Sequence, residues 1–258
     1  MKKQGKILLS FDIEEFDLPR EHGAEISLEE GVKVSKLGLE RILKILKDEK
    51  MKATFFVTGN FAKMEPEIVK RIEAEGHEVG CHGVDHFKPQ EDDIIESKKI
   101  IEAVLGHEVY GYRQPRMGKI AYKKMKVAGY LYDSSVNPAF IPGRYNNLKT
   151  PREPYMKEGI LEIPTSVATG VRIPLFWLAL HLFPKWLYLF LAKRALKRDG
   201  YFATYFHPWE FSEIREYKIP SYIKLNSGKK MGERLRYVIR NLKGEDMIYY
   251  EYSKFKRV

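Results

Sequence analysis

The sequence predicts an α/β protein built on a parallel sheet or barrel. Short apolar runs typical of buried strands alternate with longer amphipathic stretches, and polar side chains follow several of the apolar runs. At 258 residues, of which 44% are hydrophobic, the chain is long enough to form one large core. It contains no linker, repeat or low-complexity segment, so we expect a single domain over residues 1–258.

The amphipathic stretches carry apolar residues at helical spacing. They cover residues 32–50, 65–75 and 92–105. Gly76, Gly106 and Gly129 each fall just past a helix-like pattern. We expect these glycines to adopt the left-handed conformation in which many helices end.

The first apolar run breaks abruptly into acids. Residues 6–17 read KILLSFDIEEFD, with four carboxylates among the last six residues. In parallel α/β proteins the C-terminal ends of strands build active sites, so these acids are candidates for metal ligand or general base. If the strand continues, Asp12 and Glu14 share one face, whereas Glu15 and Asp17 face solvent or cap the next element.

Two histidines follow another strand-like run. The segment CHGVDH at residues 81–86 places His82 and His86 four residues apart, directly after a short apolar run. Two neutral imidazoles at this spacing can reach one cation if the backbone between them starts a helical turn. A single pair of this kind is more often a helix cap and a core hydrogen bond, so the other segments must decide.

Two further strand-like runs end in polar groups. Residues 201–211, YFATYFHPWEF, place His207 at the end of an apolar run, before a proline that cannot continue the ladder. Arg113 follows the run at residues 110–112. An arginine there could keep a catalytic carboxylate ionised, because a nearby cation lowers the pKa of an acid.

The ordered set of motifs resembles the polysaccharide deacetylases that share the NodB homology domain, also called carbohydrate esterase family 4. The matching motifs are SFD at 10–12, ATFFV at 53–57, HxxxH at 82–86, YRxP at 112–115, YDSS at 132–135, EIP at 162–164 and FHPWE at 206–210. Any one of them is weak, but the ordered set is specific and covers most of the chain. The resemblance implies the distorted, incomplete β/α barrel of the NodB type, with seven strands and a metal at its C-terminal mouth.

The resemblance also implies a role for each matched residue. Asp12 would be the general base, Arg113 the cation that orients it, and His207 the general acid. His82 and His86 would bind a divalent metal, with Zn²⁺ as our first expectation and Co²⁺, Ni²⁺ or Fe²⁺ as alternatives. The reaction this set serves is hydrolysis of an N-acetyl group on an amino-sugar glycan.

The chain departs from the family at the second acid of the first motif. The usual aspartate is Ile13, whose alkyl side chain cannot bind a metal. We expect Glu14 to be the ligand instead, as in family branches with an Asp-x-Asp or Asp-x-Glu arrangement, with Glu15 as the fallback. Gly83 is a further departure, because many family members have a hydroxyl residue after the first histidine.

Three residues near the motifs have two interpretations each. Asp133 is either a partner for His207 or a turn cap for the residues that follow it. Trp209 either binds substrate by stacking on a sugar face or packs in the core. Cys81, the only cysteine, excludes an internal disulfide, and we expect a buried thiol rather than a soft metal ligand.

Residues 171–198 are unusually apolar and aromatic, VRIPLFWLALHLFPKWLYLFLAKRALKR. Prolines and charged residues interrupt the run before it reaches the ~20 apolar residues that a membrane span requires, so we expect an insertion of two helices, at 176–183 and 185–198. The favoured interpretation is a core helix with a basic solvent face. The alternative, given a net charge of +10, is contact with an anionic membrane face or a lipid-linked glycan. Deacetylases of exported-polysaccharide pathways are similar in having an apolar insertion at this place.

Partners and location are predicted from absences. Basic residues are spread along helix faces with matching acids and no nucleic-acid motif occurs, so we expect no nucleic-acid partner. The sequence MKKQG runs straight into the first strand without the apolar region of a signal peptide. We therefore expect a cytoplasmic protein, either free or peripheral to the inner membrane face. The oligomeric state is not predicted.

Two other functions compete with deacetylation. One is metal-independent hydrolysis of a cyclic amide, of the allantoinase kind, with the same surroundings of Asp12, Arg113 and His207. The other is a glycan-binding module that the change to Ile13 has inactivated. A pure binding module has no need for a base, its orienting cation and an acid together, which argues against this alternative.

Overall fold

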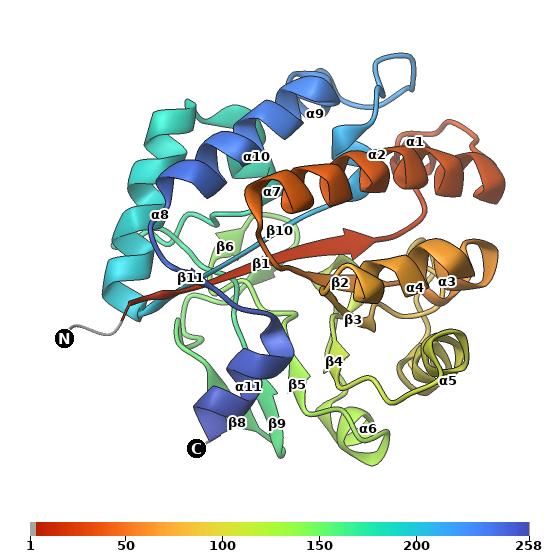
Figure 1. The fold of residues 1–258 in the computed structure, drawn as a ribbon, viewed down its shortest axis with the longest axis horizontal. Helices are drawn as coiled ribbons and strands as arrows, with labels where there is room; N and C mark the ends of the chain where they lie inside the picture. Colours follow the sequence, from red (N-terminus) through yellow and green to blue (C-terminus); the bar gives the residue numbers. More distant parts are fainter. Residues whose placement is uncertain (1–3, 258) are drawn as a thin grey trace.

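One open sheet runs through the described part of the chain, residues 4–257 of this computed structural model (Figure 1). Its strands lie in the order β10 (Tyr201–Phe206), β1 (Lys6–Ile13), β2 (Thr54–Val57), β3 (Glu78–Cys81), β4 (Gly111–Tyr112), β5 (Tyr132–Asp133), β9 (Ile160–Glu162) and β8 (Tyr155–Lys157). A ninth strand, β11 (Glu245–Asp246), pairs with the start of β1. The strands from β10 to β9 are parallel to one another, and β8 is antiparallel to β9.

The predicted fold class is confirmed. The sheet curls into part of a barrel that stays open, because β10 and β8 are its two edges within the described residues. The seven parallel strands from β10 to β9 form the predicted series, and β8 and β11 extend it. A separate hairpin, β6 (Phe140–Ile141) and β7 (Tyr145–Asn146), lies beyond the end of β5.

Strand β1 is buried along nearly its whole length, as its continuous apolar sequence predicts. Leu9 and Phe11 face the main core, whereas Leu8 faces a second core that α11 (Tyr249–Arg257) covers. Successive side chains of a strand alternate between faces, so Asp12 lies on the same face as Leu8. The strand therefore delivers its acid to the inside of the curled sheet.

The three predicted helices are present. They are α2 (Leu28–Glu49), α4 (Pro66–Ala74) and α5 (Asp93–Leu105). Helix α2 begins four residues earlier than predicted, because the hydroxyl of Ser27 accepts a hydrogen bond from the backbone N–H of Glu30 at 3.1 Å and caps the helix there. Gly76, Gly106 and Gly129 all have the expected positive φ, at 86°, 83° and 81°.

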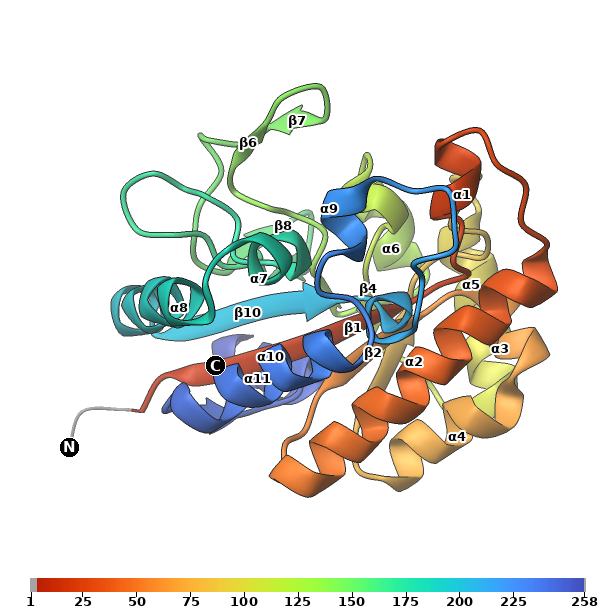
Figure 2. The same cartoon turned by 90° about the horizontal axis from the view of Figure 1, so that it is seen from above.

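Helices cover both faces of the sheet. The others are α1 (Leu18–Glu21), α3 (Gly59–Met64), α6 (Tyr122–Val127), α7 (Trp177–Leu182), α8 (Lys185–Asp199), α9 (Ser221–Lys224) and α10 (Lys229–Asn241), with 3₁₀ turns at Pro115–Met117 and Pro208–Phe211. Helices α2 and α10 lie on one side of β1 and β10, and α11 lies on the other (Figure 1). Figure 2 shows the β6–β7 hairpin standing out from the body near the ends of these strands.

The apolar insertion forms two helices, as predicted. Helix α7 ends at Leu182, and α8 begins at Lys185 after a proline. The buried side of α8 packs against β10, the strand that follows it (Figure 2). No helix in residues 4–257 combines the length and the apolar character needed to cross a membrane.

Candidate metal centre and active site

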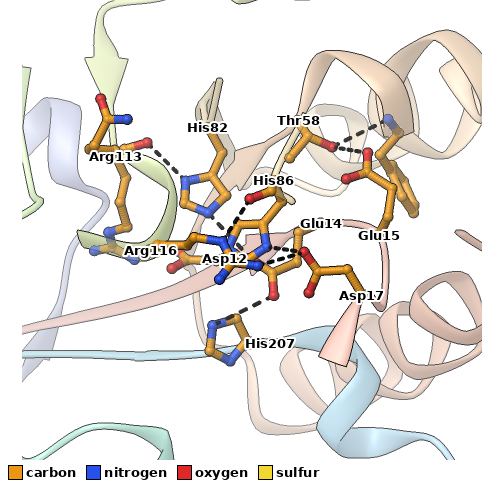
Figure 3. Close-up of polar contacts among 12 residues, drawn as sticks. Asp12, Glu14, Glu15, Asp17, Thr58, His82, His86, Arg113, Arg116 and His207 are labelled. Carbon is orange, nitrogen blue, oxygen red and sulfur yellow. Dashed lines mark hydrogen bonds and ion pairs between the residues drawn. The ribbon is translucent and has the colours of Figure 1, made fainter. Parts of the chain in front are cut away.

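The register of the parallel strands brings the predicted site residues to one edge of the sheet. Strand β10 ends opposite Phe11 of β1, so Asp12 and His207 lie at neighbouring strand ends. Strands β3 and β4 pair through their last residues, which places His82 and Arg113 beside each other. Figure 3 shows these side chains gathered in one space.

Glu14, His82 and His86 form the candidate metal centre. Their ligand atoms lie within 4.8 Å of one another, and all three residues are buried. Glu14 Oε2 is 2.8 Å from His86 Nε2 and 3.5 Å from His82 Nε2. A carboxylate oxygen with two imidazole nitrogens is a donor set that Zn²⁺ and related divalent cations accept. Glu14 thus lies beside both histidines, where the sequence predicts the ligand that Ile13 cannot supply.

The remaining ring nitrogens of both histidines are already engaged. His82 Nδ1 donates to the carbonyl oxygen of Arg113 at 2.8 Å, and His86 Nδ1 donates to Asp17 Oδ2 at 2.9 Å. These bonds turn each Nε2 toward Glu14, as a metal ligand requires. Within the described residues, Glu14 Oε2 and His82 Nε2 are buried without a hydrogen-bond partner. Such atoms are rare in folded proteins, and a divalent cation fits the space they face.

The charges around Glu14 favour its ionised form. Burial alone would raise its pKa, but the charges on His86 and His207 hold the pKa of Glu14 well below its usual range. Burial opposes a charge on His86, whereas Glu14 and Asp17 raise the pKa of that imidazole well above its usual value. The site therefore attracts positive charge, which a divalent cation would supply in place of a proton.

Arg113 holds Asp12 beside the metal centre. Arg113 Nη1 lies 2.5 Å from Asp12 Oδ1 and 2.9 Å from Ser10 Oγ. The rest of the guanidinium donates to the carbonyl and hydroxyl oxygens of Ser134 and lies 4.2 Å from the ring centroid of Phe56. A buried guanidinium fixed in this way also fixes the Asp12 carboxylate, which lines the cavity.

His207 belongs to a buried chain of two imidazoles and one carboxylate. Its Nδ1 donates to Glu210 Oε1 at 3.0 Å, while Glu210 Oε2 accepts from Nε2 of His181 in α7 at 3.0 Å. His207 Nε2 therefore faces Glu14, whose Oε1 is 4.0 Å away. Burial lowers the pKa of His207, but Glu14 and Glu210 raise it above its usual value.

Glu210, and not Asp133, is the partner of His207. Asp133 instead accepts from the backbone N–H of Ser135 at 3.2 Å and from its hydroxyl at 2.7 Å, so the turn-cap interpretation is the correct one. The acid three residues after His207 has the spacing of a capping box, a signal that identifies Glu210 from the sequence. Sequence reasoning missed His181, because only the packing of α7 brings it to Glu210.

Asp17, expected at the surface or as a cap, is 4% exposed and supports the metal centre. It accepts a hydrogen bond from His86, and Arg116 Nη2 donates to the same oxygen at 3.3 Å. Asp17 does occupy the N-cap position of α1, although its side chain makes no capping hydrogen bond. The surface position is wrong because Phe16 anchors this segment in a small core with Trp209. That packing turns the segment after β1 inward.

Glu15, the fallback ligand, is also buried, contrary to the surface position expected. Its Oε1 accepts from the hydroxyl of Thr58 at 2.7 Å, and Figure 3 shows it turned away from the metal centre. Thr58 caps α3, so Glu15 is tied to a helix start and not to the histidines.

The backbone around His82 explains two features of the sequence. Gly83 has a φ of +69°, and a Cβ built there would lie 2.8 Å from Pro115 Cγ. The hydroxyl residue common in the family therefore does not fit this loop. Cys81 is fully buried, and burial raises the pKa of its thiol to about 12, so it is an inert core residue as predicted.

A cavity opens over the candidate metal centre. Its wall includes Arg144 and Tyr145 from the β6–β7 hairpin and Trp177 from α7. Trp209 also borders it but is 2% exposed, and its Nε1 donates to Glu14 Oε1 at 3.1 Å while its ring stacks on His207. Trp209 is therefore a support of Glu14, and its sugar-stacking role stays a prediction.

Comparisons with known proteins agree with this geometry. The family model described as polysaccharide deacetylase matches residues 6–131. A peptidoglycan deacetylase of Helicobacter pylori is 30% identical over 115 residues, which cover 41% of this chain and 39% of the relative. A peptidoglycan-N-acetylmuramic acid deacetylase of Bacillus subtilis is 27% identical over 124 residues, which cover 45% and 47%. The matches span less than half the length of these relatives.

Solved structures share the fold. A Mycobacterium smegmatis protein assigned to the polysaccharide deacetylases has a TM-score of 0.64 at 19% identity, over 100% of this chain and 91% of that one. An allantoinase also has a TM-score of 0.64, at 15% identity, over 96% of this chain and 89% of that one. The resemblance inferred from the motifs is therefore confirmed, because residues 6–131 match the polysaccharide deacetylase family.

Proposed function

We propose that the protein is a metal-dependent hydrolase that removes N-acetyl groups from an amino-sugar glycan. The observation that carries this proposal is the convergence of Glu14, His82 and His86 between a fixed carboxylate, Asp12, and a fixed imidazole, His207. The family match and the relatives named for peptidoglycan deacetylation support it.

In the proposed reaction each proton is taken up or released at a stated atom. A divalent cation bound by the three ligands would supply Lewis acidity for the acetyl carbonyl and for the attacking water. Asp12 would take the proton of that water while Arg113 keeps the carboxylate in place. As the C–N bond breaks, His207 would give a proton from Nε2 to the leaving amine, with its Nδ1 held by Glu210. The products are acetate and a free amino sugar.

The test combines metal content with acetate release from acetylated amino-sugar oligomers. We expect purified wild type to contain stoichiometric metal, and Glu14→Ala and His82→Ala to lose metal and activity together. Glu15→Ala is the matched control, because Glu15 bonds Thr58 and not the histidines.

Two outcomes would contradict the proposal. Metal-free protein that hydrolyses a cyclic ureide, assayed in parallel because an allantoinase shares the fold, would identify a cyclic amide hydrolase. Stoichiometric metal without turnover of any acyl substrate would identify a binding module.

Three finer points are part of the proposal. They are Zn²⁺ as the native metal, a lipid-linked glycan as the substrate, and a cytoplasmic location at the inner membrane face. Metal analysis of protein from its own host, assays on lipid-linked and free glycans, and cell fractionation test them in turn.

A further inference from the structure

Helices α7 and α8 and the loop before them expose large apolar side chains that no other part of residues 4–257 covers. We call this set the insertion face. Its members, with their exposed fractions, are Val171 (70%), Ile173 (41%), Leu182 (46%), Trp186 (65%) and Phe190 (50%). Exposed apolar groups of this size, gathered on neighbouring elements, are typical of a docking surface.

The loop and α8 form one continuous surface. Arg194 Nε donates to the hydroxyl of Thr169 at 3.2 Å, and the same guanidinium lies 5.6 Å from the ring centroid of Phe190. Thr169 is two residues from Val171, so Arg194 joins the loop to the aromatic part of the helix. Figure 2 shows α7 and α8 side by side next to β10.

Helix α8 has two distinct sides. Tyr188, Leu189, Ala192 and Leu196 are buried against the body of the protein. The solvent side carries aromatic residues in its first half and cations in its second half. The sequence-based preference for a core helix with a basic solvent face is therefore only half correct, because Trp186 and Phe190 lie on the solvent side.

The insertion carries much of the positive charge of the chain. Between Glu162 and Asp199 the sequence has six Lys and Arg and no acidic residue. That leaves 39 of the 45 basic residues for the rest of the chain, against all 35 acids. Asp199 offsets little of this charge, because its buried side chain pairs with Arg152 at 2.6 Å and approaches only Arg198 of the segment, at 3.8 Å.

We infer that the insertion face docks on an anionic membrane surface. Exposed aromatic and aliphatic groups enter the boundary between headgroups and acyl chains, while lysines and arginines beside them pair with anionic lipids. A second copy of this chain fits the face less well, because a symmetric interface would bring the exposed lysines and arginines of α8 close to their own copies. The long stems of Lys193 and Lys197 allow their charges to reach headgroups while the aromatic rings are buried.

The position of the face relates it to the cavity. Helix α7 connects the two, because Leu182 at its end belongs to the insertion face. Trp177, at the start of α7, lines the cavity itself. Docking would therefore bring the cavity close to lipid headgroups. A lipid-linked substrate would follow only if the proposed deacetylase function holds, whereas docking can be tested without it.

The test is sedimentation of the full chain with vesicles of phosphatidylcholine alone or with added phosphatidylglycerol. We expect binding only to the anionic vesicles and a strong loss of binding as salt rises toward ~1 M, where the screening length falls to about 3 Å. Trp186→Glu combined with Phe190→Glu should abolish binding without loss of fold, since both residues are exposed in the free protein. Val127→Glu is the matched control, because Val127 is 84% exposed on α6, away from the insertion.

Two further measurements separate the contribution of the positive charges from that of the apolar side chains that enter the membrane. Lys193→Gln and Lys197→Gln should each weaken binding to anionic vesicles roughly fivefold. Binding should also shift tryptophan fluorescence to shorter wavelength, and Trp186→Phe should remove most of that shift while keeping binding. Equal binding to neutral vesicles, or binding unchanged in the double glutamate variant, would overturn the inference. So would a wild-type dimer that ignores vesicles and becomes monomeric in that variant.

Discussion

Two buried glutamates on the same sheet have opposite surroundings. Glu78, at the start of β3, is satisfied at both oxygens: Oε2 accepts from the hydroxyl of Thr54 at 2.6 Å and from the backbone N–H of Tyr250 at 3.0 Å, and Oε1 accepts from the hydroxyl of Tyr132 at 2.6 Å. Glu14, at the other end of the strands, has one oxygen, Oε2, that satisfies no hydrogen-bond geometry in the described residues and faces only the imidazoles of His86 and His82, at 2.8 and 3.5 Å. The first carboxylate ties α11 to the sheet, and the second is free to bind.

The pKa values of the two acids shift in opposite directions because their neighbours differ in charge. Burial raises the pKa of Glu78 to about 7, because its neighbours are uncharged hydroxyl and amide donors that only partly offset desolvation. The pKa of Glu14 lies well below the usual range despite equal burial, because His86 and His207 supply positive charge. Burial alone therefore does not mark a functional acid. A functional acid is marked by a carboxylate oxygen that accepts no hydrogen bond and faces cationic or metal-binding groups.

The largest expected effect comes from replacing one carboxylate oxygen of Glu14 by an amide group. The same replacement in Glu78 serves as the control. Glu14→Gln should remove a ligand and with it the metal, and so abolish acetate release, a greater loss than the ~10- to 100-fold that loss of an outer-shell partner costs. Glu78→Gln is the matched control and should keep metal content and activity. Metal analysis and initial rates on both variants check this. A Glu14→Gln protein with full metal content would show that the open oxygen is not a ligand.

The next effect should separate catalysis from metal binding. In Glu210→Gln only one of the two histidines can face the amide oxygen, and the other must face the NH2 group. One bond of the chain that orients His207 is therefore lost or reversed. We expect kcat to fall by ~10²- to 10⁴-fold, the range of general acid catalysis, with metal content unchanged. Glu213→Gln, on the exposed acid that pairs with Arg41, should leave kcat intact. Loss of metal in Glu210→Gln would instead mean that the hydrogen-bonded series of His207, Glu210 and His181 helps to hold the metal.

A smaller effect should come from Asp17, which touches the centre only through His86. Asp17→Asn weakens the acceptor for His86 Nδ1 and should lower metal affinity by ~10- to 100-fold. Competition with a chelator of known affinity measures the change. Asp85→Asn is the control, because Asp85 adjoins His86 in sequence but only accepts from the backbone N–H of Lys88 and the side chain of Asn60. Equal affinity in both variants would contradict a supporting role for Asp17.

The sequence predicts those features that depend on short segments. Apolar runs and helical spacing identify the strands and the helices α2, α4 and α5, and the ordered motifs predict that Glu14 and the two histidines meet at one edge. Features that depend on distant packing were not predicted. Asp17 and His86 are 69 residues apart, and their bond forms only because Phe16 turns the segment inward. His181 lies in an insertion that has no motif to mark it.

The smallest expected effect concerns the pH dependence of folding stability that Glu78 causes. It is also the sharpest test of the contrast between Glu78 and Glu14. Glu78 has a folded-state pKa of about 7 against 4.5 for the free side chain, so the folded protein binds the extra proton between these values. Stability at this site is therefore fully present below pH 4.5 and is lost as pH rises through 7. The total loss is about 3 kcal/mol, because a pKa that differs by one between the folded and unfolded states corresponds to about 1.36 kcal/mol.

Glu78→Gln removes this titration and leaves every other one in place. Urea unfolding of wild type and variant at several pH values gives the difference between their unfolding free energies, in which the other groups cancel. We expect wild type to lose stability relative to the variant as pH rises, while the acetate-release rate of the two proteins stays equal. A difference that does not change with pH would mean that Glu78 is ionised in the folded protein throughout. The contrast with Glu14 would then lie in the open oxygen alone and not in the direction in which each pKa moves.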